Sequence, residues 1–247
     1  MNTAQPQDKD RYHTMQTPTP EGNQRSIDVR VRQLLTDFEQ LREALLALSD
    51  DIWLDIDHND IQALEEGVRF KRAYNERMAE FNRHTGALAS LIQQFTHVSA
   101  GPPVPPSSGA EDARTIRELD REQAHTLDED FRYKRPYGFV FCGKSYHNLA
   151  TWSRIYITIC NLLIERDAER FAALPDSPNF IHRRGNRDFS WNSDDLRIPL
   201  ELPYGIYVET NLSANSIARR IGLLLDHFEI DRREFVVYLH QDRDAEQ

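Results

Sequence analysis

One stretch of the chain has the residue spacing of a phosphate-binding loop. Residues 138–145 match the pattern Gly-x-x-x-x-Gly-Lys-Ser, in which backbone amides and the lysine bind the phosphates of a nucleotide. Such a loop follows a buried strand and opens a helix, whereas its interior here is Phe-Val-Phe-Cys, which itself favours a strand. The pattern predicts, as an alternative function, a small nucleotide-binding enzyme. Its binding residues would be Gly138, Gly143, Lys144 and Ser145.

A second group of residues has the chemistry of a nucleic-acid-binding surface. Residues 182–187 (His-Arg-Arg-Gly-Asn-Arg) stand between two aromatic segments, which predicts a hairpin tip that carries three arginines. Arginines bind phosphate oxygens, and polar residues near the start of the next helix would extend one basic face. The predicted contacts to DNA are His182, Arg183, Arg184, Arg187, Asn211, Asn215, Arg219 and Arg220. The alternative is that the turn is polar only because it is solvated.

Other reactive residues lack the partners that catalysis or metal binding requires. Cys142 and His147 could form a thiol–imidazole pair, but no spacing indicates a third group that would orient the histidine. Oxygen-bearing side chains at positions 55, 57, 59 and 66 match a calcium loop, but Asp60 stands where that loop needs glycine. Histidines and cysteines show no zinc-ligand spacing. We therefore predict a non-enzymatic protein without metal, cofactor or catalytic residues.

Helical periodicity dominates residues 26–99, which we predict to be a helical hairpin or coiled coil. The spacing of apolar residues alternates between four and three, as in a coiled-coil seam. This seam consists of Ile27, Val31, Leu34, Phe38, Leu41, Leu45 and Leu48. The first helix would run from a Ser26 cap to about residue 51, and the second over residues 61–98 from a cap at Asn59 or Asp60. Long isolated helices are marginal in water, so each needs a partner from its own chain or from another copy.

The segments on either side of the helices have little structural content. Residues 1–25 lack an apolar core and are rich in Gln, Thr and Pro, which predicts a disordered tail. The run Gly-Pro-Pro-Val-Pro-Pro at 101–106 excludes helix and sheet. Residues 100–131 are therefore predicted to be a Pro-rich linker, with a weak helix from 111 to 131, and residues 242–247 a short tail.

Residues 132–241 have the mixed pattern of a small α+β domain. Aromatic and β-branched runs predict strands at 137–142, 180–181, 189–191, 204–210 and 234–240, and a turn at 143–144 adds one more. Apolar residues at helical spacing predict helices over 148–166 and 213–228. This order suits one mixed sheet covered by two helices.

Charge and composition limit the classes of partner. The net charge is −10, and residues 1–132 hold 15 basic against 24 acidic residues. An acidic helical half repels phosphates, so we expect residues 26–99 to bind a partner protein or a second copy, and residues 182–187 to make any contact with DNA. No segment has the apolar length of a membrane span or a secretory signal, and two cysteines make no disulfide framework. These features predict a cytoplasmic protein without a membrane partner.

Residues 137–240 resemble a small C-terminal α+β accessory domain found in some bacterial restriction and phage-defence proteins. The resemblance rests on the opening Gly-Phe-Val-Phe strand with its turn, on Trp152 early in the first helix, and on residues 205–215 (Gly-Ile-Tyr-Val-Glu-Thr-Asn-Leu-Ser-Ala-Asn). It implies a module that helps to recognise nucleic acid or protein and that carries no catalytic motif. The predicted function is an adaptor for antiviral defence or restriction, and the alternative is a purely protein-binding oligomeric adaptor.

Overall fold

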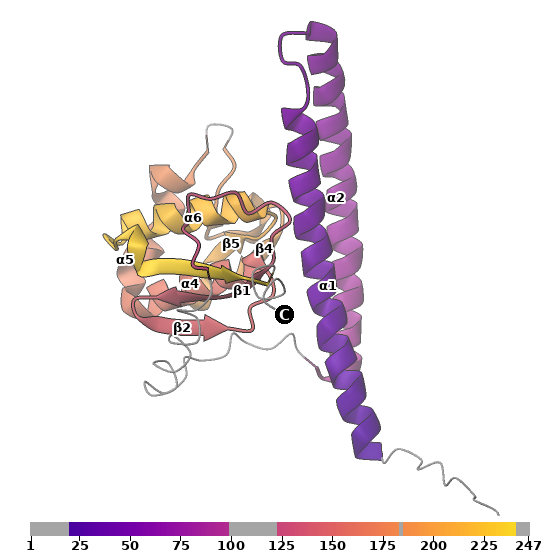
Figure 1. Ribbon diagram of the computed structural model, residues 1–247, viewed down its shortest axis with the longest axis vertical. Helices are drawn as coiled ribbons and strands as arrows, with labels where there is room; N and C mark the ends of the chain where they lie inside the picture. The colour runs from indigo at the N-terminus through magenta and orange to yellow at the C-terminus, as the bar shows by residue number, and fades with distance from the viewer. Residues whose placement is uncertain (1–19, 99–122, 183–184, 241–247) are drawn as a thin grey trace, which may run out of the picture.

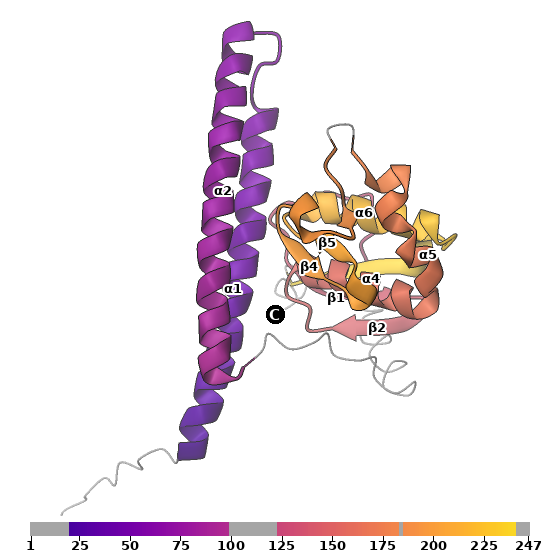
Figure 2. The ribbon, with the colours of Figure 1, turned by 180° about the vertical axis from the view of Figure 1, so that it is seen from behind.

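The computed structural model describes residues 20–98, 123–182 and 185–240 (Figure 1). Two long antiparallel helices form one part, and an α+β domain lies beside them (Figures 1 and 2). The predicted tail at 242–247 and most of the predicted linker at 100–131 lie outside the described residues. The predicted tail at 1–25 is described only from Pro20, where the first helix already begins.

The helical hairpin consists of α1, Pro20–Leu54, and α2, Ile61–Thr96. The first helix extends beyond the predicted end near residue 51, since neither Pro nor Gly interrupts residues 50–54. The second begins where predicted, because the Asp60 carboxylate accepts hydrogen bonds from the backbone N–H groups of Gln62 and Ala63 at 2.8 and 3.3 Å. No helix in the described part of the chain is long and apolar enough to cross a membrane.

The two helices pack along one side of α1. Val31 and Leu35 are buried against Ala89, Ile92 and Val98 near the open end of the hairpin. Towards its tip, the Tyr74 hydroxyl donates to the backbone oxygen of Leu45 at 2.8 Å and the Lys71 ammonium to that of Ser49 at 3.2 Å. These contacts fix the register between the helices. Of the two predicted alternatives, the structure therefore forms the pairing within one chain.

Only part of the predicted seam is used in this packing. Every second residue of the seam, beginning with the first, is 41–49% exposed, whereas Val31 is 9% exposed. The exposed residues are Ile27, Leu34, Leu41 and Leu48. The contact with α2 is centred on Val31 and Leu35 and not on the middle of the predicted seam. A single facing helix covers only part of the apolar side of α1.

The C-terminal domain confirms the α+β class but divides its strands differently. The helices are α4, Trp152–Arg166; α5, Ala168–Ala172; and α6, Ala214–His227. The strands are β1, Pro136–Phe141; β2, Lys144–His147; β3, Phe189–Ser190; β4, Pro199–Glu201; β5, Tyr207–Glu209; and β6, Phe235–Leu239. They form two antiparallel sheets, β2-β1-β6 and β3-β5-β4, instead of the one mixed sheet predicted.

The order of the strands and of helices α4 and α6 along the domain is nevertheless the predicted one, while the short helix α5 was not predicted. One strand was placed incorrectly: Phe180 ends a short 3-10 helix and Ile181 forms only a single bridge with Arg187, while residues 199–201 form β4. Pro178 opens that 3-10 helix, and its ring removes the amide that a strand would need. In the second sheet β5 lies between β3 and β4 and pairs antiparallel with both, so the connection from β3 to β4 crosses over β5.

The core of the domain also recruits part of the predicted linker. Helices α4 and α6 pack on each other, and the core around them includes Trp152, Tyr156 and Phe189. Leu127 and Phe131 belong to the same buried cluster. His125 forms a single bridge with Val237 of β6, and the described residues 126–131 are turns and loop instead of the predicted helix. The domain thus begins before the predicted boundary at residue 132.

The first β-hairpin requires glycine at position 138. A Cβ atom there would lie 2.3 Å from the backbone oxygen of Tyr146 on β2. At Gly86, in the exposed middle of α2, a Cβ atom meets nothing within 4 Å. Gly138→Ala should therefore separate the two strands, whereas Gly86→Ala should only reduce the entropy of the unfolded chain.

We predict that Gly138→Ala lowers the free energy of unfolding by about 2 kcal/mol or more, since backbone atoms must shift. Gly86→Ala should raise it by about 0.5–1 kcal/mol. Urea unfolding followed by circular dichroism measures both. Equal stabilities of the two variants would contradict the close approach of β1 and β2.

Candidate functional site

The residues of the predicted phosphate-binding loop form a β-hairpin. Gly138 lies within β1, and Phe141 pairs with Lys144 across a two-residue turn. Cys142 and Gly143 both have positive φ, 48° and 73°, which is the geometry of a tight hairpin turn. Ser145 is buried in β2, and no helix follows it directly. The strand–loop–helix that binds phosphate is thus not formed, because the apolar loop interior pairs as a strand.

Of the predicted nucleic-acid contacts, the structure brings His182 and Arg220 together, on a buried acid. Arg183 and Arg184 lie outside the described residues. Arg220 is 6% exposed, and its Nε donates to Asp188 at 2.6 Å, while His182 Nε2 lies 2.9 Å from the same carboxylate oxygen. Asp188 is itself 1% exposed. Arg220 therefore neutralises a buried acid and is not available to a phosphate.

Each of the other predicted contacts has a different environment in the structure. The Arg187 guanidinium donates to the backbone oxygen of Pro175 at 2.7 Å. Asn211 accepts from Asn82 of α2 at 3.3 Å, and Asn215 accepts from the backbone N–H of Phe131 at 2.7 Å. Arg219 is exposed on α6. The structure does not bring these residues together into one basic face.

The weaker chemical candidates are separated as well. Cys142 stands at the turn of the β1–β2 hairpin, whereas His147 pairs with Gly138 at its other end. Among the described residues, no cluster of three or more His, Cys, Asp or Glu side chains could hold a metal ion.

The most elaborate polar site lies where α1 meets the α+β domain. Glu43 of α1 is 8% exposed and accepts hydrogen bonds from the backbone N–H groups of Ser153 and Trp152, at 2.8 and 3.2 Å. These are the first two amides of α4, which have no partner within their own helix. Glu43 thus caps a helix from which it is separated by more than 100 residues of chain.

Neighbouring side chains extend this cap. Glu39 accepts from Arg154 Nε at 2.8 Å and from the Thr151 hydroxyl at 2.9 Å, and Arg42 donates to the Ser153 hydroxyl at 2.8 Å. A negative charge at a helix N-terminus is favoured by the helix dipole. Glu39 and Glu43 are one helical turn apart, so α1 presents both carboxylates to the first turn of α4.

Burial also changes the acid–base chemistry of the cap. Desolvation raises the pKa of Glu43 to about 7, although the amide of Ser153 and the charge of Arg42 act in the opposite direction. Glu43 borders a groove of about 420 Å³ between α1 and residues 133–135, which Leu41 and Trp152 also line. The Glu43 carboxyl group, which joins the helical hairpin to the α+β domain, therefore has a pKa close to neutral pH.

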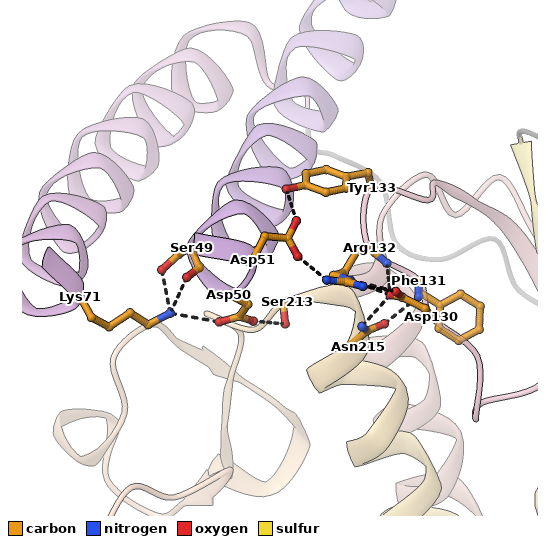
Figure 3. A network of polar contacts seen from close by, with 10 residues as sticks. All are labelled: Ser49, Asp50, Asp51, Lys71, Asp130, Phe131, Arg132, Tyr133, Ser213 and Asn215. Carbon is orange, nitrogen blue, oxygen red and sulfur yellow. Dashed lines mark hydrogen bonds and ion pairs between the residues drawn. The ribbon is translucent and has the colours of Figure 1, made fainter. Parts of the chain in front are cut away.

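A second polar network joins the parts nearer the tip of the hairpin (Figure 3). Asp50 accepts from Lys71 of α2 at 3.1 Å and from the hydroxyl of Ser213, the residue before α6, at 3.2 Å. Asp51 accepts from the Tyr133 hydroxyl at 2.7 Å and from Arg132. These two donors, the Tyr133 hydroxyl first, lower the pKa of Asp51.

The same network holds the loop that leads into β1. Asp130 accepts from Asn215 of α6 at 2.9 Å and forms an ion pair with Arg132 (Figure 3). Tyr133 has a φ of 60°, a conformation that costs free energy for a residue with a side chain. Its hydroxyl contact with Asp51 therefore holds a strained residue against α1.

Sequence reasoning missed this interface. Acidic residues one turn apart on a long helix usually face solvent, and no local pattern shows which distant helix they cap. The weak signal was that Glu39, Glu43 and Asp50 all lie off the apolar seam on one side of α1. The arrangement can hold two parts in a fixed orientation, but it places no nucleophile beside a base.

No protein-family model matches this chain, and neither does a curated protein or a solved structure. The resemblance of residues 137–240 to accessory domains of restriction and phage-defence proteins therefore stays a prediction.

We predict that Glu43→Gln changes the pH dependence of unfolding. The carboxyl group binds its proton more tightly in the folded chain, with a pKa of about 7 against 4.5, so its contribution to stability is complete below pH 4.5 and is lost as the pH rises to 7. Between these limits the wild type should lose about 3 kcal/mol relative to Glu43→Gln, whose amide keeps the shape and the acceptor. Urea unfolding of both proteins across this range measures the difference. Parallel pH profiles would show that Glu43 is not buried at the interface.

We predict that Arg220 stabilises the folded domain. Arg220→Ala leaves the buried Asp188 without its cationic partner and should lower the free energy of unfolding by about 3–5 kcal/mol. The adjacent Arg219 is exposed, so Arg219→Ala should change it by less than about 0.5 kcal/mol. Chemical unfolding of the two variants separates them. If Arg220→Ala were as stable as Arg219→Ala, the arginine would be free for another role.

Proposed function

We propose that this protein is a non-enzymatic assembly protein. In this proposal the helical hairpin is a binding arm, and the α+β domain is a recognition module that the arm holds at a fixed position and orientation. The observation that carries the proposal is the combination of two features of α1. One side is locked to the domain through Glu43 and Asp50, while another exposes regularly spaced apolar side chains.

The locked side supports a fixed orientation. Glu43 reaches the start of α4 and Asp50 reaches the start of α6, so two separate helices of the domain are attached to one helix of the arm. Two attachment points prevent the domain from rotating about either one. A rigid arm keeps the recognition module at a constant distance from whatever the arm binds, which raises the effective concentration at the second site.

The exposed side supports binding. Large apolar side chains on a solvent-exposed helix face lower solubility without contributing to the core, and contiguous apolar patches mark interaction sites. The predicted role in DNA recognition depends on Arg183 and Arg184, because Arg187 and Arg220 donate hydrogen bonds within the domain. A place in restriction or antiviral defence and a cytoplasmic location likewise remain predictions from the sequence.

We predict a single, narrow distance between the arm and the domain. Spin labels on the exposed Cys142 and on an Ala87→Cys substitution in α2 would report it by double electron–electron resonance, since Cys160 is buried. An excess of unlabelled chain excludes distances between copies. Replacing both Glu39 and Glu43 by Ala should broaden the distribution. A broad distribution in the otherwise wild-type chain would contradict a rigid assembly protein.

A further inference from the structure

The exposed apolar residues of α1 form one straight ridge. Ile27, Leu34, Leu41 and Leu48 are each seven residues apart and are 44%, 41%, 49% and 43% exposed. Seven residues make almost two turns of an α-helix, so side chains at this spacing follow one another along the same side. At all four positions more than two fifths of the side chain stays exposed, so α2 and the α+β domain leave this ridge open, although Leu41 also borders the groove beside Trp152.

A matching ridge runs along α2. Leu88 and Phe95 are seven residues apart and are 46% and 87% exposed, and Tyr74 and Phe81 continue this spacing towards the hairpin tip. Leu91, 63% exposed, and Phe70, 37% exposed, lie next to it. We call the two ridges together the apolar strip.

The two ridges lie on the same side of the hairpin. At 100° per residue, Leu34 stands about 60° to one side of Val31, which faces α2. Glu39 and Glu43, which face the α+β domain, stand about 80–120° to the other side of Val31. In α2, Phe81 follows Met78 by three residues and Leu88 precedes Ile92 by four, so both are rotated by about 40–60° in the same sense as Leu34 from Val31. Because the helices are antiparallel, equal steps from the shared contact turn both ridges to one side, away from the domain.

The register within the hairpin places the residues of the strip in layers. Lys71 contacts Ser49 and Tyr74 contacts Leu45. A residue of α1 therefore lies at the same height along the hairpin as the residue of α2 for which the two residue numbers add up to about 120. Leu34 is then within one helical turn of Leu88, Leu41 of Phe81, and Ile27 of Phe95. The strip is thus a series of apolar layers, each with one residue from either helix.

We propose that the apolar strip binds a second copy of this chain and closes a four-helix bundle. This inference rests on the proposed function, in which the hairpin is a binding arm, and names its partner. A ridge with a period of 3.5 residues is complemented by another ridge of the same period, and a two-fold axis along the hairpin supplies one from an identical strip. That axis places α1 of each copy against α2 of the other, with every layer at the same height.

The exposed area agrees with a stable dimer. Eight side chains of the strip and its immediate border are between 37% and 87% exposed. They are Ile27, Leu34, Leu41, Leu48, Phe70, Leu88, Leu91 and Phe95. At about 200 Å² for a fully exposed large apolar side chain, they present about 800 Å² per copy, which is the area that each partner buries in a stable interface.

The test is the mass of the full chain in solution, by light scattering over a range of concentrations. The wild type should be a dimer. Leu34→Glu combined with Leu88→Glu places carboxylates in one apolar layer and should raise the dissociation constant at least ~100-fold. Val29→Glu is the matched control, because Val29 is 64% exposed but lies off the strip, and this variant should remain a dimer.

Two further measurements keep the outcomes distinct. If the glutamate variant fails to fold by circular dichroism, Leu34→Ala with Leu88→Ala retains helix propensity and should still weaken the dimer. A monomeric wild type with a narrow arm–domain distance would overturn the second copy as partner but leave the binding arm in place. A monomer with a broad distance would overturn both. A dimer that persists in both strip variants would overturn the strip as its interface.

Discussion

The hydrogen bonds from the first amides of α4 to Glu43 are the contact on which the arrangement of the molecule depends. A buried helix terminus without acceptors costs free energy, and α4 itself supplies only the Thr151 hydroxyl, which accepts from the amide of Arg154. Glu43 supplies the acceptor for the two preceding amides from a different part of the chain. The hairpin therefore completes the structure of the domain, because the N-terminus of α4 is not fully capped without Glu43.

The neighbours of α1 explain the composition of its different sides. The helix has three sides with different neighbours: Val31 and Leu35 face α2, Glu39 and Glu43 face the domain, and Leu34 and Leu41 face solvent. A helix in an ordinary hairpin needs only one apolar side. The charged side is buried because its carboxylates meet amides and guanidinium groups, and the third side provides the binding capacity that the proposed function requires.

Several charged residues in the described part of the chain stabilise the structure. Arg220 neutralises the buried Asp188, Arg154 holds Glu39, and Arg132 connects Asp51 with Asp130. In each case a guanidinium group satisfies carboxylates that the fold has partly or fully removed from water, which is the role that its planar, multiple donors suit best. A cluster of arginines in the sequence is therefore weak evidence for a phosphate-binding face until the acids around it are known.

The sequence by itself determined the elements whose causes are local. The spacing of apolar residues predicted both long helices, Asp60 was one of two residues predicted to cap α2, and the aromatic runs and turns predicted most of the strands and helices α4 and α6. The pairing of the strands into two sheets, the burial of Arg220 and the cap that Glu43 provides were decided only by the tertiary structure. Each joins residues far apart in the chain, and the free energy that selects it appears only when both partners lose water together. The unused half of the α1 seam has the same origin: periodicity shows that a helix has an apolar side, but only packing shows how much of that side its own chain covers.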